Sequence, residues 1–473
     1  MLDLSHYSAG HRAELQSLLE SPAWQQVLAS GLVEQVREER LRPGKVRDFI
    51  GTVVDDLLSL NEARVAAEIA GGCRDREALY RSLSRWPAGL GQRNPHISFL
   101  GLNLTARCNV QPHCIYCNQP WVEATVGLAG WKRVIDEVTA DRDGGGPYIY
   151  VTGGEPLVLD EEIWGDDGLV HYATERGAGV NVNTNAILIT PEVALRLIKA
   201  GLYRLHISLD TADAELQNYF YGGDYFQAVM EGIYNVQLAR DLVGATYPVI
   251  HTNCVLTNRN LRLFPQLFEF ILEKHKQTGD KSDPFFNDLF PHVIPVGGQS
   301  NQWLRPTEAE FELFYREVWQ QVQDIWTRYQ DEHNVPLEKR GDLFGYFSNP
   351  FLRVEHEGGL EAYVRASADG RYGSLALPDY CYVAPTQASF TPDGYQFRCG
   401  SHGIRRCMPL GNVREQGVFE SIRGGIADLD SLPRHEYCDG CALACLYINQ
   451  AVASRLRARL DELLAAQTDQ SVA

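Results

Sequence analysis

The chain has 473 residues, 44% of them hydrophobic, a length typical of two or three domains. Its formal net charge of −18 argues against a surface that follows nucleic-acid phosphates, because such surfaces need clustered lysine and arginine. No uninterrupted apolar run approaches the roughly eighteen residues of a membrane span, and the first residues lack the basic and apolar regions of a signal peptide. We therefore expect a cytoplasmic protein with neither a nucleic-acid nor a membrane partner.

Residues 1–95 are predicted to form a helical N-terminal extension. Charged and apolar residues interleave there in segments such as HRAELQSLLE and DREALYRSLSRW, a pattern typical of amphipathic helices. The stretch RWPAGLGQRNP, which contains prolines and glycines, is expected to be a linker. These helices are expected to cover the domain that follows or to bind substrate.

Residues 96–330 alternate short β-branched or aromatic runs with helical segments. This alternation predicts parallel strands in βα units, and six such strands predict an α/β fold that forms a partial (β/α)6 barrel. Ligands of such sheets lie at the carboxyl ends of the strands. The expected strands lie within residues 96–104, 148–154, 180–186, 204–210, 247–258 and 290–298.

Three cysteines follow the first expected strand as C-x5-C-x2-C, namely Cys108, Cys114 and Cys117. Three close thiolates suit an iron–sulfur cluster that has one iron open to an exchangeable ligand. A closed zinc site is the alternative, and it would need a fourth ligand such as His113. The triplet taken alone leaves both possibilities open.

A second motif, TGGEP, ends the second expected strand. Gly153 and Gly154 allow another backbone segment or a ligand to approach closely, and Glu155 adds a carboxylate beside them. Main-chain polar groups and a carboxylate at a strand end can hold an ammonium group. Because the carboxyl ends of parallel strands meet, we expect this motif and the cysteine triplet to lie together.

The triplet and the GGE motif resemble those of the radical S-adenosylmethionine (SAM) superfamily, over a core of roughly residues 96–300. The usual triplet there is C-x3-C-x2-C, so the first gap of this chain is two residues longer. The resemblance implies a [4Fe–4S] cluster that binds SAM, reductive cleavage of SAM to a 5′-deoxyadenosyl radical, and abstraction of a hydrogen atom from the substrate. It also implies an electron donor such as flavodoxin or ferredoxin.

The resemblance also assigns residues to the cofactor site. Tyr116 matches the aromatic position beside the adenine, and Gly154 and Glu155, with Gly153, match the residues that receive the methionine ammonium group. Polar residues at the ends of later strands are expected near the ribose and the carboxylate, although capping of the strand ends is the alternative for some of them. This polar set comprises Asn183, Thr184, Asn185 and Ser208, and Asn253 on the fifth expected strand resembles a similar polar position.

Three residues are candidates for a general base: His206, Asp210 and His251. Each lies on or next to an expected buried strand. Buried histidine and aspartate side chains also serve as hydrogen-bonded structural groups, so the general-base role and a structural role both remain open.

Beyond the core, residues 305–333 predict one long helix with aromatic side chains on its packed face. Residues 331–375 are expected to be an irregular linker. The chain after residue 460 is expected to be a frayed helix.

The C-terminal part, residues 376–473, contains six of the eleven cysteines of the chain. Cys381 and Cys399 flank Gly394 as C-x12-G-x4-C, and Cys438 and Cys441 follow as C-x2-C. This spacing resembles SPASM and twitch domains, which hold auxiliary iron–sulfur clusters, and a zinc ribbon is the alternative.

The twitch arrangement implies one auxiliary [4Fe–4S] cluster on Cys381, Cys399, Cys438 and Cys441. Cys407 and Cys445 are then spare, or serve a second, incompletely ligated cluster. Sulfatase-maturing relatives carry an aspartate directly after the G-x4-C cysteine, where this chain has Gly400, so a base must come from elsewhere. The remaining cysteines, Cys73 and Cys254, are expected to be small buried hydrophobic residues.

These features predict a radical SAM enzyme, with two classes of substrate. The first is a ribosomal peptide that undergoes crosslinking, oxidation or epimerisation in natural-product biosynthesis. The second is a small polyol, aminosugar or nucleotide-sugar that undergoes dehydrogenation, epimerisation or rearrangement. A non-enzymatic iron–sulfur or zinc scaffold is a further alternative, which the presence of the GGE motif disfavours.

Overall fold

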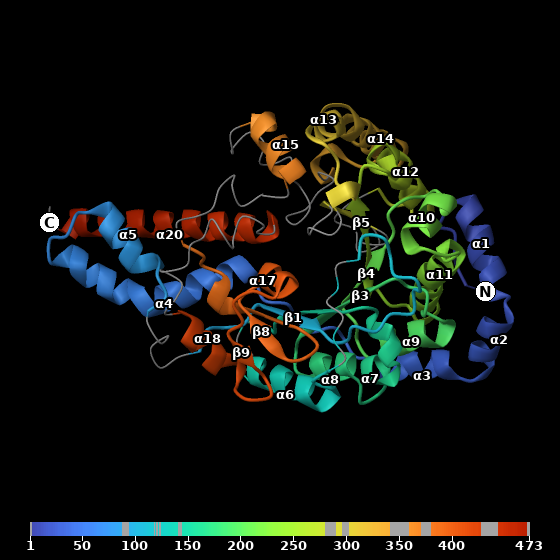
Figure 1. The fold of residues 1–473 in the computed structure, drawn as a ribbon, viewed down its shortest axis with the longest axis horizontal. Coiled ribbons are helices and arrows are strands. Elements are labelled where there is room, and N and C mark those ends of the chain that lie inside the picture. Colours follow the sequence, from blue (N-terminus) through green and yellow to red (C-terminus); the bar gives the residue numbers. More distant parts are fainter. Residues whose placement is uncertain are drawn as a thin grey trace.

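The computed structural model describes residues 2–87, 94–117, 119, 122, 124–140, 144–279, 290–295, 302–340, 359–369, 380–426 and 443–470. Its centre is a nine-stranded sheet in the order β6-β5-β4-β3-β2-β1-β7-β8-β9 (Figure 1). The first six strands are parallel to their neighbours and coincide with the six segments predicted from sequence. They are β1 (Phe99–Asn103), β2 (Tyr148–Thr152), β3 (Gly179–Thr184), β4 (Arg204–Ser208), β5 (Val249–Leu256) and β6 (Phe290–Pro295).

Helices connect these strands, as the βα pattern predicted. Proline or a capping side chain starts several of them; for example, the Thr190 hydroxyl accepts a hydrogen bond from the Val193 amide in front of α9. The connecting helices are α6 (Leu128–Val138), α7 (Glu161–Trp164), α8 (Leu169–Glu175), α9 (Pro191–Lys199), α10 (Ala214–Tyr221), α11 (Phe226–Val243) and α12 (Phe264–Lys274).

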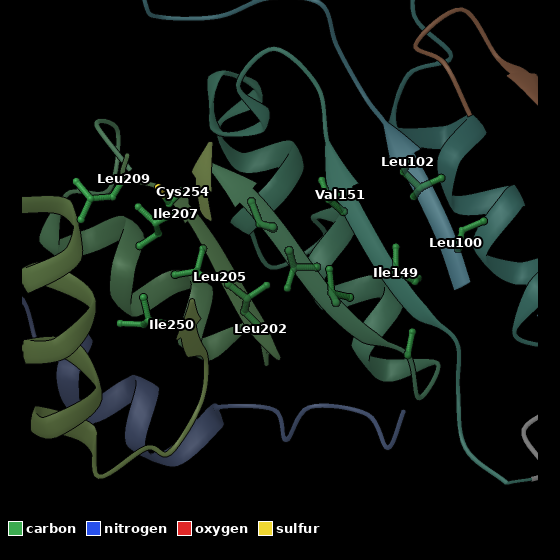
Figure 2. Close-up of a cluster of buried hydrophobic side chains, with 14 of the residues drawn as sticks. Leu100, Leu102, Ile149, Val151, Leu202, Leu205, Ile207, Leu209, Ile250 and Cys254 are labelled. Carbon is green, nitrogen blue, oxygen red and sulfur yellow. The ribbon is translucent and has the colours of Figure 1, made fainter. Parts of the chain in front are cut away.

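The two faces of the sheet differ in character. On β4, buried Leu205 and Ile207 alternate with the partly exposed His206 and Ser208, and β2 alternates in the same way. Strand side chains point alternately to opposite faces, so one face is apolar and the other polar or aromatic. Figure 2 shows apolar side chains of neighbouring strands gathered into one buried cluster, including Leu100, Leu102, Ile149, Val151, Leu205, Ile207 and Ile250.

The N-terminal helices separate into two groups that lie on opposite sides of the molecule (Figure 1). The first group, α1 (Ala9–Leu19), α2 (Pro22–Ala29) and α3 (Leu32–Glu39), lies against α9 and α11. There the Trp24 indole donates a hydrogen bond to Asn235 of α11 at 2.8 Å. This group covers the barrel, as one of the two sequence-based alternatives proposed.

The second group, α4 (Phe49–Ala70) and α5 (Arg76–Ser84), packs against the last helix of the chain, α20 (Leu443–Gln470). Leu456 and Leu460 of α20 are buried, and Arg459 forms an ion pair with Glu62 of α4. These contacts explain why α20 remains helical to Gln470, whereas the sequence predicted a frayed end after residue 460.

The segment between the barrel and the C-terminal cysteines contains more helix than the sequence predicted. The single helix expected at residues 305–333 is divided into α13 (Glu308–Leu313) and α14 (Trp319–Glu332) by a π-helical turn at Phe314–Val318. Residues Gly359–Asp369 form α15, although the region was expected to be irregular. Tyr315 and Ser367 join the π-turn to α15 through their hydroxyls, 3.1 Å apart.

The C-terminal part extends the sheet of the barrel. β7 (Gln387–Phe390) pairs in parallel with β1, and β8 (Tyr395–Phe397) and β9 (Gly411–Asn412) follow as antiparallel strands. The Glu137 carboxylate of α6 accepts hydrogen bonds from the first amides of α18 (Val418–Ile426), and α17 (Gly400–Arg405) lies between β8 and β9 in sequence. Among the described residues, none of the helices combines the length and hydropathy needed to cross a bilayer.

Candidate active site

The cysteine loop, residues 104–117, leaves the carboxyl end of β1 and is fixed at both ends. The Leu104 amide donates to Thr152 of β2 at 2.9 Å, and the Ile115 amide donates to Phe220 of α10 at 3.0 Å. The Cys117 amide bonds to the Cys114 carbonyl, which closes a turn around the last two cysteines. All three cysteines are partly exposed, in the loop that follows the carboxyl end of β1.

The surroundings of these thiols favour a bound metal centre over free thiolates. Burial raises the pKa of all three, and the nearby Cys117 and Asp210 raise the pKa of Cys114 further, so a cation is needed to keep the thiolates charged. Within the described part of the chain, no group of His, Cys, Asp or Glu is arranged to hold one metal ion.

Gly153 and Gly154 allow the loop after β2 to run directly beside the cysteine loop. The amide of Gly154 donates to Thr105 at 2.7 Å, and the amide of Glu155 donates to Arg107 at 2.8 Å. A Cβ atom on Gly154 would lie 2.1 Å from the Arg107 carbonyl oxygen, and one on Gly153 would lie 2.6 Å from that of Thr105. The two motifs predicted to meet are therefore joined by backbone hydrogen bonds that only glycine permits.

The Glu155 side chain is fully buried and points into the protein. One carboxylate oxygen accepts hydrogen bonds from the Leu157 amide and the Thr184 hydroxyl, both at 2.9 Å, and the other accepts one from the Asn185 amide at 2.7 Å. Burial raises the pKa of Glu155 to about 7, against the opposing effect of these hydrogen bonds. In this structure the carboxylate joins the ends of β2 and β3.

Asn185 continues this chain of contacts to the cysteine loop. Its side-chain amide donates to the Asn109 side chain at 2.7 Å, directly after Cys108. Glu155 therefore fixes the backbone of Asn185, and the Asn185 side chain in turn holds the cysteine loop at Asn109. The sequence placed Thr184 and Asn185 beside the cofactor, and the structure gives both a role in connecting the strand ends.

Tyr116 and Asp210 form a second link to the cysteine loop. The Tyr116 hydroxyl donates to one oxygen of Asp210 at 2.6 Å, while the other oxygen accepts from the Val255 amide at 2.7 Å. Burial raises the pKa of Asp210 to about 6. Because both oxygens are engaged, the geometry favours a positioning role for Asp210 over the general-base role proposed from sequence.

The remaining polar strand ends pair with one another. The Asn253 side chain donates to the Asn183 side chain at 2.9 Å, across β4, and the Ser208 carbonyl accepts from the Tyr221 hydroxyl at 2.8 Å. Asn183 and Ser208 therefore lie at the carboxyl ends of β3 and β4, as the sequence predicted, and Asn253 lies within β5 at the level of Ser208.

The polar face of the sheet carries aromatic rings that the sequence analysis interpreted only as strand residues. Phe99 lies 6.2 Å from Tyr150, the Tyr150 ring meets His206 edge-on at 5.9 Å, and His206 stacks on His251 at 5.5 Å with 16° between the rings. The two candidate bases are thus part of an aromatic lining. In YIYVT, Tyr148 and Tyr150 alternate with Ile149 and Val151 and therefore point to the other face of the sheet. This alternation was the signal in the sequence that could have identified the aromatic lining.

One side chain of α20 contacts two of the C-terminal cysteines. The Asn449 side-chain amide donates to the Cys445 backbone carbonyl at 2.7 Å and lies 3.9 Å from the Cys381 sulfur. Its side-chain oxygen accepts from the Tyr382 amide at 2.7 Å. The sequence treated Cys445 as a spare residue or a less certain ligand, and Asn449 links its backbone to the Cys381 thiol.

The other cysteines are distributed as follows. Cys399 precedes α17, and Cys407 follows it with its amide bonded to His402. Cys438 and Cys441 lie outside the described residues. Cys254 is buried, as predicted, and its thiol contacts the Asp210 carbonyl at 3.4 Å; Cys73 is partly buried against the core.

Comparison with known proteins supports this site. The sequence profile of the Radical SAM superfamily matches residues 102–255, which contain the triplet and the GGE motif. The AdoMet-dependent heme synthase of Methanosarcina barkeri is 33% identical over 367 residues, covering 75% of this chain and 90% of the relative. Mycofactocin maturase MftC of Mycobacterium tuberculosis is 32% identical over 245 residues, and the match spans 57% of its length.

The solved structures that resemble this chain have lower identity. A SAM-bound structure of anSMEcpe is 16% identical with a TM-score of 0.48, covering 78% of this chain and 99% of that chain. Streptococcus suis SuiB bound to the precursor peptide SuiA is 16% identical with a TM-score of 0.45, covering 74% of this chain and 70% of that chain.

Proposed function

Because this chain belongs to the radical SAM superfamily, we propose that it is an enzyme that abstracts a hydrogen atom from a peptide and thereby modifies it. A [4Fe–4S] cluster, when bound, supplies the electron that cleaves SAM to methionine and the 5′-deoxyadenosyl radical. Transfer of one hydrogen atom from the substrate then gives 5′-deoxyadenosine and a substrate radical. The observation that supports a peptide substrate is the similarity to mycofactocin maturase MftC.

Cys108, Cys114 and Cys117 are proposed to hold the cluster, and SAM would bind at the adjoining strand ends. The backbone of Gly153 and Gly154 lies at this point, where its polar groups can receive the methionine ammonium group. Glu155 and Asn185 fix the strand ends through the hydrogen bonds described above. Their proposed role is to hold the SAM-binding strand ends in a fixed position relative to the cysteine loop.

The aromatic lining is proposed to hold the substrate. Tyr150 of β2, His206 of β4 and His251 of β5 project from the polar face of the sheet and form a continuous series of ring contacts. Such a surface can contact an apolar or aromatic side chain while excluding water from a radical. His206 and His251 remain the candidate bases, since both lie on this lining.

The C-terminal cysteines are proposed to hold an auxiliary [4Fe–4S] cluster that accepts an electron from the substrate radical or contacts the substrate. Cys381 and Cys445 are brought together through Asn449. Tyr382, which follows Cys381, contacts Tyr80 of α5 and Trp86, so a cluster held by Cys381 would lie next to this segment.

The proposal is tested with the reconstituted protein, SAM and a reductant. Short peptides encoded next to the gene are added one at a time, and both peptide mass and 5′-deoxyadenosine are measured. We expect one peptide to change mass with matching 5′-deoxyadenosine formation, and no change in a Cys108→Ala, Cys114→Ala, Cys117→Ala variant. A small polyol or aminosugar that is converted in place of any peptide contradicts the proposal.

A tetrapyrrole substrate is a second candidate, favoured by one observation. The relative with the more complete match is a heme synthase, of which this chain covers 90%. Fe-coproporphyrin III, the compound in the name of another relative, is therefore included in the same assay. Its conversion with stoichiometric 5′-deoxyadenosine would replace the peptide by a tetrapyrrole.

A further inference from the structure

Strand β3 carries a buried asparagine, Asn181, that makes no side-chain hydrogen bond. The residue is 0% exposed, and neither its side-chain oxygen nor its side-chain nitrogen has a hydrogen-bond partner in the described part of the chain. Val180 and Val182 on either side of it belong to the apolar core, so Asn181 points to the polar face of the sheet. Because burial without a partner costs a carboxamide its hydrogen bonds to water, such residues are rare and call for a ligand or a bound water.

The polar neighbours of Asn181 in the sheet do not satisfy it. In the strand register Asn181 is paired with Tyr150 of β2 on one side and with Arg204 of β4 on the other. The Arg204 guanidinium lies instead over the rings of Tyr148 and Tyr203, 5.7 and 5.3 Å from their centres. The carboxamide therefore keeps its full capacity to donate and accept hydrogen bonds.

Two aromatic rings of the lining cover Asn181. Tyr150 and His206 come from β2 and β4, which are separated by β3, yet their ring centres are only 5.9 Å apart. The ring pair therefore spans β3 at the level of Asn181 and of Asn183, the next residue on that face. Both ring residues are partly exposed, so a ligand on the lining meets the rings first and the carboxamide behind them. Side-chain rotation of this kind is common when a surface binds a ligand.

A second unsatisfied polar group lies at the same level of the sheet. Ser389 of β7 is paired with Gly101 of β1, and Gly101 is paired with Tyr150. Ser389 is 6% exposed, and its hydroxyl has no hydrogen-bond partner among the residues that the structure describes. Gly101 places no side chain between the two, and a Cβ there would lie 3.0 Å from the Ser389 hydroxyl oxygen. This level of the polar face thus has hydrogen-bonding groups at both ends, Ser389 and Asn181, with an aromatic ring between them.

The chemistry of a carboxamide determines which ligand fits it. Asparagine offers N–H donors and an acceptor oxygen side by side. In an extended peptide the N–H and C=O of one residue point to the same side, as in the hydrogen-bonded pairs of antiparallel strands. A carboxamide can therefore pair with both groups of that residue, whereas a cation or a carboxylate matches only one of them. The aromatic lining can contact the side chain of the same residue.

We propose that Asn181 binds the main chain of an extended peptide, which, given the proposed function, is the substrate. Entry of the peptide turns the Tyr150 ring away from His206, and the Asn181 carboxamide then pairs with the N–H and C=O of one peptide residue. The hydrogen bonds that Asn181 lacks in the free protein are made in the complex. Asn181 thus selects a peptide through its main chain and takes no part in hydrogen abstraction.

The first measurement is thermal unfolding of the reconstituted full-length protein without substrate. Asn181→Leu keeps nearly the same side-chain shape without polar groups, so we expect a higher unfolding midpoint than wild type, because a buried group without a partner is removed. Asn235→Leu on α11 is the matched control. Asn235 is also buried, but its oxygen accepts from Trp24 and its nitrogen donates to Ile189, both at 2.8 Å, so we expect a lower midpoint.

The second measurement is binding of a main-chain probe, N-acetylphenylalanine N-methylamide, to the same proteins, followed by saturation-transfer difference NMR with SAM present and no reductant. Asn181→Leu, and Asn181→Ala, which adds no bulk, should each bind the probe about fivefold more weakly or worse, since two hydrogen bonds are lost. Asn235→Leu, measured below its unfolding midpoint, should stay within about twofold of wild type. The ester analogue, in which oxygen replaces the N–H of the phenylalanine, should lose most of the dependence on Asn181.

A lower unfolding midpoint for Asn181→Leu overturns the proposal, because the carboxamide would then already be hydrogen-bonded in the free protein, for example to a buried water. Unchanged probe affinity in both Asn181 variants, or no binding of the probe to wild type, also overturns it. Failure here leaves the proposed peptide modification intact. If the assay of catalysis instead finds tetrapyrrole conversion while the probe still binds through Asn181, the proposed function fails and main-chain recognition at Asn181 stands.

Discussion

The Tyr116 hydroxyl donates a hydrogen bond to Asp210, with the two oxygens 2.6 Å apart. Tyr116 lies between Cys114 and Cys117, and Asp210 follows β4, so this contact fixes the cysteine loop to the barrel. Tyr116→Phe leaves one oxygen of a buried carboxylate without its donor, and we expect a loss of about 1–3 kcal/mol in the free energy of unfolding. Chemical denaturation of the iron-free protein measures it.

Tyr172→Phe is the control for this change, because the Tyr172 hydroxyl donates to Asp136 at an exposed position. We expect its effect to stay below about 1 kcal/mol, since water replaces the lost partner. Similar losses of unfolding free energy in the two variants would show that the Tyr116 hydrogen bond stabilises the protein no more than an exposed one does.

Asp210→Asn separates a positioning role from a general-base role. Asparagine keeps an oxygen for the Val255 amide, and its own amide can donate to the Tyr116 hydroxyl. We therefore expect a smaller loss of stability than for Tyr116→Phe, with substrate conversion retained. If this variant still forms 5′-deoxyadenosine but no longer converts the substrate, Asp210 acts as the base.

Gly154→Ala tests the close approach of the GGE motif to the cysteine loop. The added Cβ would lie 2.1 Å from the Arg107 carbonyl oxygen, a rigid backbone atom. We expect destabilisation of about 3 kcal/mol or more, together with a lower iron content after reconstitution. Gly424→Ala in α18, where a Cβ meets nothing within 4 Å, should be neutral or stabilising.

The sequence was sufficient to predict the parallel strands and the meeting of the two motifs, because strand periodicity and glycine spacing are local properties. It could not show that both carboxylate oxygens of Glu155 accept hydrogen bonds from Thr184 and Asn185, since those partners lie at the end of another strand. For the same reason Asn449 was missed: its relation to Cys381 depends on how α20 packs. The pairing of β7 with β1 likewise requires the tertiary fold.

Glu155→Gln should reduce stability as well as SAM affinity. The amide oxygen can still accept from Leu157 and Thr184, but the new amide group would face the Asn185 N–H, which needs an acceptor. We expect a loss of about 1–3 kcal/mol. Glu192→Gln, which alters only an exposed ion pair with Arg196, is the control. An unchanged unfolding free energy together with tenfold weaker SAM binding would instead place the carboxylate in contact with SAM.

The raised pKa of Glu155 makes the stability of the protein depend on pH. Its folded pKa, about 7, lies above the ordinary value of 4.5, so the folded state retains a proton that the unfolded state loses between these values. Stability from this group is therefore fully present below pH 4.5 and declines as pH rises to about 7. Relative to Glu155→Gln, the wild type should lose roughly 3 kcal/mol across this window. A parallel pH dependence in both proteins would contradict the prediction.

The last prediction concerns Cys445. Asn449 contacts both the Cys381 sulfur and the Cys445 backbone, from which we infer that Cys445 belongs to the C-terminal cysteine site, whereas Cys407 contacts only His402 among the described partners. We expect Cys445→Ala to remove about four irons from the reconstituted protein, the content of one [4Fe–4S] cluster, and Cys407→Ala to retain them. Iron analysis and electron paramagnetic resonance of the reduced proteins measure both. Loss of iron in Cys441→Ala with none in Cys445→Ala would restore the twitch assignment made from spacing, because the fourth thiolate would then come from the C-x2-C pair.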